Sequence, residues 1–464
     1  MMRIAFLLVI LGCSSSPRAQ DDAAVPPVDV TPVPDCCDLD GPPIDAAVDA
    51  PIDAPPPGLV TVHVFSPFDG RPFAARVLFA GPHDELIADV MTDAQGHAAV
   101  AMAAGYVTMI RPSNTTGFDL TTVLGVKQGD TIEIGVYGGD FTELGTETIV
   151  LPALPGNPGA QVFTPCGFLS TQQPVYVNPA CRQGVGVLGR SSGPTPMYSY
   201  LANHTMTAGA TVQMPAWQPA ATTQVTLTGL PQSTTISPFL EMFTDVGLRY
   251  DEADKDFSTG GGRGPVQSFF HAPLAGDLLY RSTLRRSDDN QLGDQAVYVR
   301  TPAAAAVTFA MSDLTARWLS PTAIDLGGPS PAFAWVQEGE DTGTIGWFST
   351  RYFGSAGFVR WDIVGPFLNR GRPGPLLSAG TFTLPQLPDP GLRISVFSDI
   401  YYARIRLLAL NPEVTYDELR PTIARLFDFE MAWVSDFSQL DVAALFALPN
   451  VQLARFSESR AVQR

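Results

Sequence analysis

Glycine and proline interrupt this chain so often that long helices have little room to form. The 464 residues include 42 glycines and 42 prolines, and only 16% of the residues are charged. Proline breaks helix interiors and glycine weakens them, whereas both are common in the turns between short strands. We therefore expect a mainly β fold with little helix, in a chain long enough for about two to four domains.

The first strand pattern begins near Leu59. Val60, Val62 and Val64 alternate with the residues between them, which is the period of two expected of a half-buried strand. The same reasoning predicts further strands at 75–79, 87–91, 97–101, 106–110, 120–126 and 131–134, with turns at 69–72 and 92–96.

These strands and turns resemble the carboxypeptidase regulatory-like, transthyretin-like β-sandwich of many secreted bacterial proteins. The matching pieces are Val60–Val64, Asp69-Gly70-Arg71-Pro72, Ala75–Leu78 and Thr92-Asp93-Ala94-Gln95-Gly96, within residues 59–112. The resemblance implies a structural or spacer module. Because the family name refers to an accessory domain, no catalytic residue is carried over.

The whole folded body is predicted to consist of tandem β-sandwich domains. We expect a first domain at 58–138, a second at 139–265 that holds a disulfide, and a third β-rich domain at 266–464. Alternating runs in the third domain lie at 296–300, 333–336 and 359–363.

Short helices are expected near the C-terminus. Thr415-Tyr416-Asp417-Glu418 has the spacing of a capping box, and Pro421 limits the helix behind it to a short piece. Residues 438–448 are the other candidate helix.

The N-terminus has the pattern of an export signal. Arg3 precedes the apolar run 4–11, which is shorter than the ~20 residues of a membrane span. The ending Ile10-Leu11-Gly12-Cys13 resembles the lipobox of bacterial lipoproteins, with isoleucine where leucine is commonest. This resemblance implies that the signal peptide 1–12 is removed and that Cys13 is lipidated. The alternative is an ordinary cleaved signal with an incidental cysteine.

Residues 13–57 are rich in proline, aspartate and alanine. Nine aspartates accompany the single basic residue Arg18, and the segment has no aromatic residue. Such a segment cannot bury enough apolar surface to offset its chain entropy, so we expect a disordered tether. With the lipid as its membrane contact, the protein is expected on the outer membrane, at the periplasmic or the surface face.

Four cysteines remain once Cys13 is lipidated, as suits an oxidising compartment. Cys166 and Cys181 are predicted to form a disulfide, and closing a loop of this size stabilises a fold by roughly 3 kcal/mol. The adjacent Cys36 and Cys37 could form a vicinal disulfide or cross-link two chains.

One acidic cluster is a candidate calcium site. Asp251, Glu252, Asp254 and Asp256 precede the glycine-rich run 260–264, and close carboxylates on a loop supply the oxygen ligands that calcium prefers. The alternative is a solvated acidic loop that binds no ion.

A group of aromatic residues is a candidate ligand platform. Trp335, Trp347, Tyr352 and Trp361 lie close together in the sequence of the third domain. On a strand surface these rings could stack against sugars or against a partner chain. The alternative is that the rings fill the core of the domain, as large rings usually do.

Catalytic motifs are scarce. Gly189-Arg190-Ser191-Ser192-Gly193 matches the nucleophile-elbow pattern, but Pro194 and Pro196 oppose the helix that must follow the serine. None of the five histidines begins a zinc-binding H-E-x-x-H or H-x-x-E spacing. We predict no catalytic residue and no cofactor apart from the candidate calcium ion.

The expected function is that of a non-catalytic envelope or cell-surface lipoprotein. Such a protein would present β-sandwich modules for binding to a partner protein, a matrix or a glycan. The net charge of −18 argues against a nucleic-acid partner, because like charges repel. The alternative is a secreted hydrolase of unrecognised type that uses scattered carboxylates.

Overall fold

A computed structural model describes a large part of the chain between Gly58 and Arg460. The described residues are 58–66, 70–112, 117–136, 144–154, 159–164, 167–170, 174–177, 185–230, 236–244, 253–256, 265–273, 276–286, 295–314, 323–325, 331–334, 345–355, 357–366, 381–394, 399–411, 414–422 and 451–460. All of them belong to one compact unit, Pro55–Arg464, and the predicted signal peptide and tether lie outside them.

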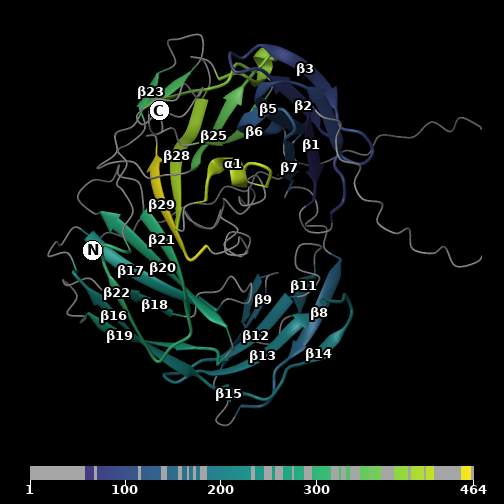
Figure 1. Ribbon diagram of the computed structural model, residues 1–464. Coiled ribbons are helices and arrows are strands. Elements are labelled where there is room, and N and C mark those ends of the chain that lie inside the picture. The colour runs from purple at the N-terminus through teal and green to yellow at the C-terminus, as the bar shows by residue number, and fades with distance from the viewer. Residues whose placement is uncertain are drawn as a thin grey trace, which may run out of the picture. The chain divides into compact units, whose positions relative to one another are not determined.

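The fold is mainly β, as predicted (Figure 1). In the described part of the chain, helix is confined to the α-helix α1 (Tyr416–Leu419) and the 3-10 helix η3 (Pro390–Leu392). The largest sheet has twelve strands. Their order across the sheet is β18 (Ala253–Asp256), β17 (Ile236–Thr244), β20 (Asp277–Arg286), β21 (Gln295–Pro302), β29 (Leu453–Arg460), β28 (Asp399–Asn411), β25 (Ile345–Gly354), β26 (Gly357–Pro366), β6 (Gly117–Lys127), β5 (Ala104–Pro112), β2 (Arg76–Ala80) and β3 (Leu86–Met91).

Five smaller sheets accompany the twelve-stranded one. In sheet order they are β4 (His97–Ala101), β1 (Leu59–Phe65) and β7 (Thr131–Gly135); β10 (Gly167–Ser170), β9 (Ala160–Thr164), β12 (Val185–Ser191), β13 (Met197–His204) and β15 (Gln218–Pro219); β11 (Val175–Val177), β8 (Gly145–Val150) and β14 (Thr211–Gln213); β19 (Val266–His271), β16 (Ala221–Thr228) and β22 (Ala306–Ala310); and β23 (Ala323–Asp325), β24 (Ala332–Ala334) and β27 (Thr381–Thr383).

The first sandwich forms where the sheet β4-β1-β7 packs on the twelve-stranded sheet. Val60, Val62 and Val64 are fully buried, as their alternation in the sequence predicted. They share one apolar core with Val107 of β5 and Val123 of β6. All seven strands predicted in this region are present, and the turn at 92–96 is closed by Asp93, whose side chain accepts hydrogen bonds from two following backbone N–H groups.

Two further pairs of packed sheets follow along the chain, as expected of a mainly β, sandwich-like fold. One packs β8, β11 and β14 against the sheet of β9, β12 and β13 around Val162, Val175 and Val187. The other packs β16, β19 and β22 against β17 and β20 around Phe269 and Tyr280. In β16, Thr223, Val225 and Leu227 are buried and alternate with more exposed residues, the pattern of a half-buried strand.

Hydrogen bonds between strands cross both of the expected domain boundaries. β6, from the predicted first domain, pairs in parallel with β26 of the predicted third domain. β17, from the predicted second domain, pairs with β20 of the third. The division at 138 and 265 stays a prediction, but strands from all three predicted domains belong to one hydrogen-bonded sheet.

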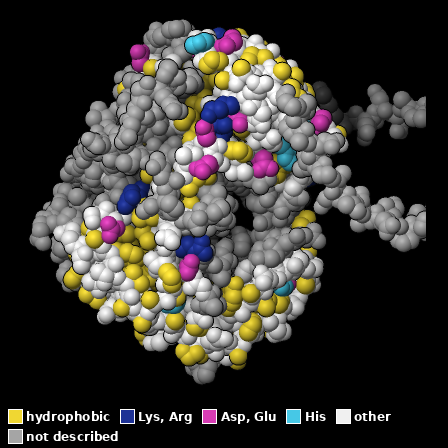
Figure 2. Space-filling view, in the orientation of Figure 1, with side chains coloured by type: hydrophobic (Ala, Val, Ile, Leu, Met, Phe, Trp, Pro, Cys, Tyr) yellow, Lys and Arg dark blue, Asp and Glu magenta, His cyan; other side chains and the backbone are white. Residues whose placement is uncertain are grey.

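The predicted capping box is present at the start of α1. The Thr415 side chain accepts from the Glu418 backbone N–H, and the Glu418 carboxylate accepts from the Thr415 N–H. Behind this helix, the Arg420 guanidinium donates two hydrogen bonds to Asp130, at 2.8 and 3.0 Å, and a third to Asp417. Lys127 bonds the same Asp417 at 2.6 Å. These charges fasten the helix to the turn between β6 and β7. Figure 2 likewise shows basic side chains on the visible face lying beside acidic ones.

This cluster of charges yields a prediction about stability. Arg420→Ala should lower the free energy of unfolding by about 2–3 kcal/mol, because it removes charged hydrogen bonds from a side chain that is only 5% exposed. Lys127→Ala is the matched control, since the Lys127 side chain is 56% exposed and its ion pair is worth less than about 1 kcal/mol. Urea denaturation measures both, and equal losses would contradict the assignment.

Candidate functional site

The nucleophile-elbow motif lies in a β-hairpin. Ser191 ends β12, and the chain returns directly as β13, with Arg190 paired opposite Tyr198. The buried Ser191 Oγ accepts a hydrogen bond from the Met197 backbone N–H at 2.7 Å. A nucleophile elbow needs a helix after the serine, and a strand occupies that place here.

Each of the described histidines has a definite place in the fold. His204 contacts the buried carboxylate of Glu147 at 2.9 Å. His271 is buried between Thr223 Oγ1 and the Ala272 carbonyl, and burial lowers the pKa of its ring. The remaining three are His63 on β1, His97 on β4 and the exposed His83 in the turn before β3.

Two of the candidate calcium ligands lie on a strand. Asp254 and Asp256 belong to β18, where they pair with Glu241 and Phe239 of β17. The flexible loop expected for these two positions is therefore wrong, because their backbone is part of the twelve-stranded sheet. Asp251 and Glu252 lie outside the described residues. Among the described residues, no three His, Cys, Asp or Glu side chains are arranged to hold a metal ion.

The three rings of the candidate aromatic platform that the structure describes lie in the core, the alternative considered for them, and form no exposed platform. Trp347, Tyr352 and Trp361 are all buried. Trp347 pairs opposite Val364 and Trp361 opposite Thr350, so the two indoles lie on opposite faces of the sheet. Strand periodicity thus divides the rings between two cores. Trp335, and the predicted disulfide partners Cys166 and Cys181, lie outside the described residues, as does Cys13.

The most unusual exposed feature of the described fold is the edge strand β3. It ends the twelve-stranded sheet, and no described strand pairs with its other side. Leu86, Ile87 and Met91 on this strand are 46%, 42% and 62% exposed. Natural proteins usually protect an edge of this kind with charges, prolines or short strands, because it can template further pairing.

The register shows which backbone groups of β3 face outward. The Thr92 N–H donates to the Ala75 carbonyl at 2.9 Å. In an antiparallel ladder such hydrogen-bonded pairs alternate with pairs that exchange no bonds. Asp89 and Met91 stand in pairs that exchange no hydrogen bonds with β2, so their backbone N–H and C=O groups point away from β2.

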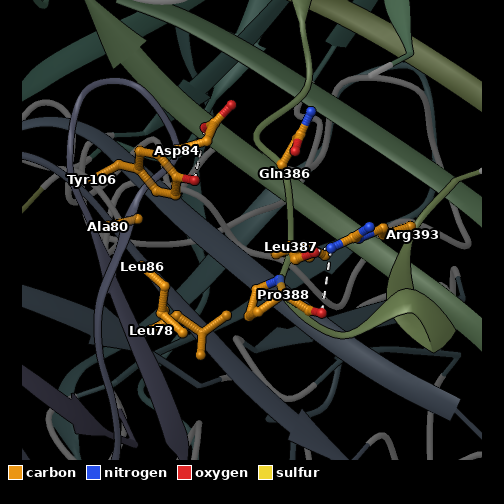
Figure 3. A pocket seen from close by; sticks show the side chains of 9 residues that line it. All are labelled: Leu78, Ala80, Asp84, Leu86, Tyr106, Gln386, Leu387, Pro388 and Arg393. Atoms are coloured by element: carbon orange, nitrogen blue, oxygen red, sulfur yellow. Dashed lines mark hydrogen bonds between the residues drawn. The ribbon is translucent and has the colours of Figure 1, made fainter. Parts of the chain in front are cut away.

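A pocket of about 100 Å³ adjoins this edge (Figure 3). Its two walls come from segments far apart in the sequence. One wall belongs to β2, β3 and β5, the other to the segment before and after η3. The lining residues are Leu78, Ala80, Asp84, Leu86, Tyr106, Gln386, Leu387, Pro388 and Arg393.

A fixed polar pair lies in the first wall of the pocket. The Tyr106 hydroxyl donates to Asp84 Oδ1 at 2.8 Å. Burial, and then the nearby Asp84 charge, raise the pKa of the Tyr106 phenol above its usual range, so the phenol stays protonated and donates. Asp84 has a φ of 64°, a left-handed conformation that Asp tolerates better than most residues.

The opposite wall is held by Arg393. Its guanidinium donates to the carbonyls of Leu387 and Pro388, the second at 3.3 Å. These bonds fix the Pro-rich segment that Figure 3 shows facing Leu78 and Leu86. The pocket thus combines apolar walls with a few polar groups of fixed direction.

Charges also lie along the outer side of the pocket. Arg76 and Asp89 form two hydrogen bonds, at 2.8 and 2.6 Å, which lower the pKa of the Asp89 carboxyl. Asp389 lies 3.8 Å from the same guanidinium. With Asp84 and Glu85 in the turn before β3, carboxylates outnumber guanidinium groups around the edge.

Sequence reasoning missed this site. The strand at 87–91 was predicted, but a strand pattern does not reveal whether the strand is central or at an edge. The segment Leu86-Ile87-Ala88-Asp89-Val90-Met91 did carry one signal. Its apolar residues occupy both odd and even positions of the strand, so they project from both faces of the sheet. If only one face of the sheet is buried, at least one of these residues must be exposed to solvent.

No protein-family model matches the chain, and no curated protein matches its sequence. Among the described residues, no helix has both the length and the apolar character needed to cross a membrane.

Proposed function

We propose that the protein is a non-catalytic, lipid-anchored envelope protein that binds a partner protein through the edge of β3. The lipobox at Cys13 and the Pro/Asp/Ala-rich tether support the anchoring. The observation that carries the binding role is the exposed edge strand with its adjoining pocket. An edge with outward N–H and C=O groups can accept an extended segment as an additional strand.

The partner segment is expected to be extended, with alternating apolar and basic side chains. Asp89 and Met91 project from the same face of β3, so the basic side chains of the added strand would project from that face, toward Asp89 and the pocket-lining Asp84. The apolar side chains would project from the other face, beside Ala88 and Val90. The net charge of −18 favours the approach of a basic segment from a distance.

A synthetic peptide tests this proposal. A labelled decapeptide of alternating lysine and valine should bind the full chain about tenfold more tightly than its glutamate–valine counterpart, a difference of about 1.4 kcal/mol. Fluorescence anisotropy at low salt gives both dissociation constants. Added salt should weaken the lysine peptide more, because exposed charges are screened.

A pair of variants at one position separates strand addition from simple charge attraction. Met91→Pro removes an outward N–H without breaking the ladder to β2, and should weaken the lysine peptide about tenfold. Met91→Thr keeps that N–H and should bind much more tightly than the proline variant. Equal binding by the two variants would mean that β3 does not accept a strand.

A further inference from the structure

Two of the histidines that are far apart in the sequence meet on one sheet. β1 pairs with β4 on one side and with β7 on the other, and the register aligns His63 with His97 and with Glu133. Directly opposite residues project from the same face of a sheet. The three side chains therefore form a single row, His97–His63–Glu133, across β4, β1 and β7.

The histidine rings already lie close together. Their centroids are 4.5 Å apart with an interplanar angle of 38°. The Val64 N–H donates to the Gly96 carbonyl at 2.8 Å, so Val64 and Gly96 form a hydrogen-bonded pair of the antiparallel ladder. The adjacent pair, His63 and His97, is therefore a non-hydrogen-bonded pair, the kind in which side chains approach most closely. Both residues are half-buried.

Neighbouring residues hold both histidines in place. The His63 ring stacks on Phe65, with centroids 4.8 Å apart and planes 22° apart. The Asp93 carboxylate accepts the His97 backbone N–H at 2.8 Å, which fixes the start of β4. A pair of ligands whose backbones are held by a ladder loses little conformational freedom when an ion binds.

We propose that His63 and His97 together bind a divalent transition-metal ion of the zinc, nickel or copper class. Imidazole nitrogen is a preferred ligand of these ions, whereas magnesium and calcium prefer oxygen. Two histidines supply two ligands, and water molecules fill the remaining positions. Glu133 is aligned with His63 in the register, and its negative charge favours a cation on this face of the sheet.

The test is a metal titration of the full chain, with its thiols alkylated so that cysteines do not bind the ion. Isothermal titration with zinc chloride should show binding that His63→Ala and His97→Ala each weaken at least about tenfold. His83→Ala is the matched control, since His83 is an exposed histidine outside the row, and it should bind as the parent chain does. Magnesium chloride should give no signal at this site.

A second measurement uses the unaltered chain. Zinc should protect His63 and His97 from modification by diethyl pyrocarbonate, and should leave His83 reactive, as mapped by mass spectrometry. Zinc affinity that is unchanged in His97→Ala, or equal modification of all three histidines with and without zinc, would overturn the proposal. Neither result depends on whether β3 binds a peptide.

Discussion

Trp361→Ala should lower the free energy of unfolding by about 3–5 kcal/mol, the cost typical of removing a large ring from a packed core. The Trp361 side chain is fully buried on β26, within the core that also holds Phe348 and Leu120. Its indole N–H donates to Thr122 Oγ1 at 2.9 Å, and Thr122 in turn bonds Thr108 at 2.8 Å. The alanine variant thus leaves a cavity and removes one donor from a buried polar chain.

Two control variants give the losses of stability expected for smaller changes. Trp361→Phe keeps most of the ring volume and loses only the N–H, so it should cost less than the alanine variant, about 1–2 kcal/mol. Tyr176→Ala, at a side chain that is 58% exposed, should change stability by less than about 0.5 kcal/mol. Urea denaturation followed by circular dichroism gives all three values. A loss below that of Tyr176→Ala would contradict the placement of Trp361.

Cys13→Ala should move the protein from the membrane fraction to the soluble fraction of the cell. The acyl chains are the proposed membrane contact, and each buried methylene contributes roughly 0.8 kcal/mol to anchoring. Fractionation followed by immunoblotting measures the change, with Cys36→Ala as the control cysteine in the tether. If the Cys13→Ala variant stays with membranes after a salt wash, the lipid anchor is not what holds the protein there.

These two predictions depend on different kinds of information. The Cys13 prediction comes from a short contiguous motif, and it needs no knowledge of the fold. The Trp361 prediction needs the structure, because Trp361 and Thr122 are 239 positions apart. The alternation at 359–363 indicated a buried face, but not that a threonine of the first sandwich accepts the indole N–H.

Local patterns were sufficient for much of the secondary structure. The valines of β1, the turn closed by Asp93 and the capping box of Thr415 and Glu418 each depend on residues within a few positions of one another. Such features follow from backbone geometry and near-neighbour hydrogen bonds, which the sequence states directly.

Strand pairing between distant segments determines which side chains lie together at the proposed sites. The five histidines look alike in the sequence, and only the register of β1 against β4 brings His63 to His97. The same limit explains the aromatic residues, since the number of residues between Trp347 and Trp361 does not show that a hairpin places them on opposite faces. By itself the sequence determined which segments become strands and turns. Tertiary structure alone decided which strand lies at an edge and which side chains meet, because pairing partners in a sheet are chosen by long-range packing rather than by chain neighbours.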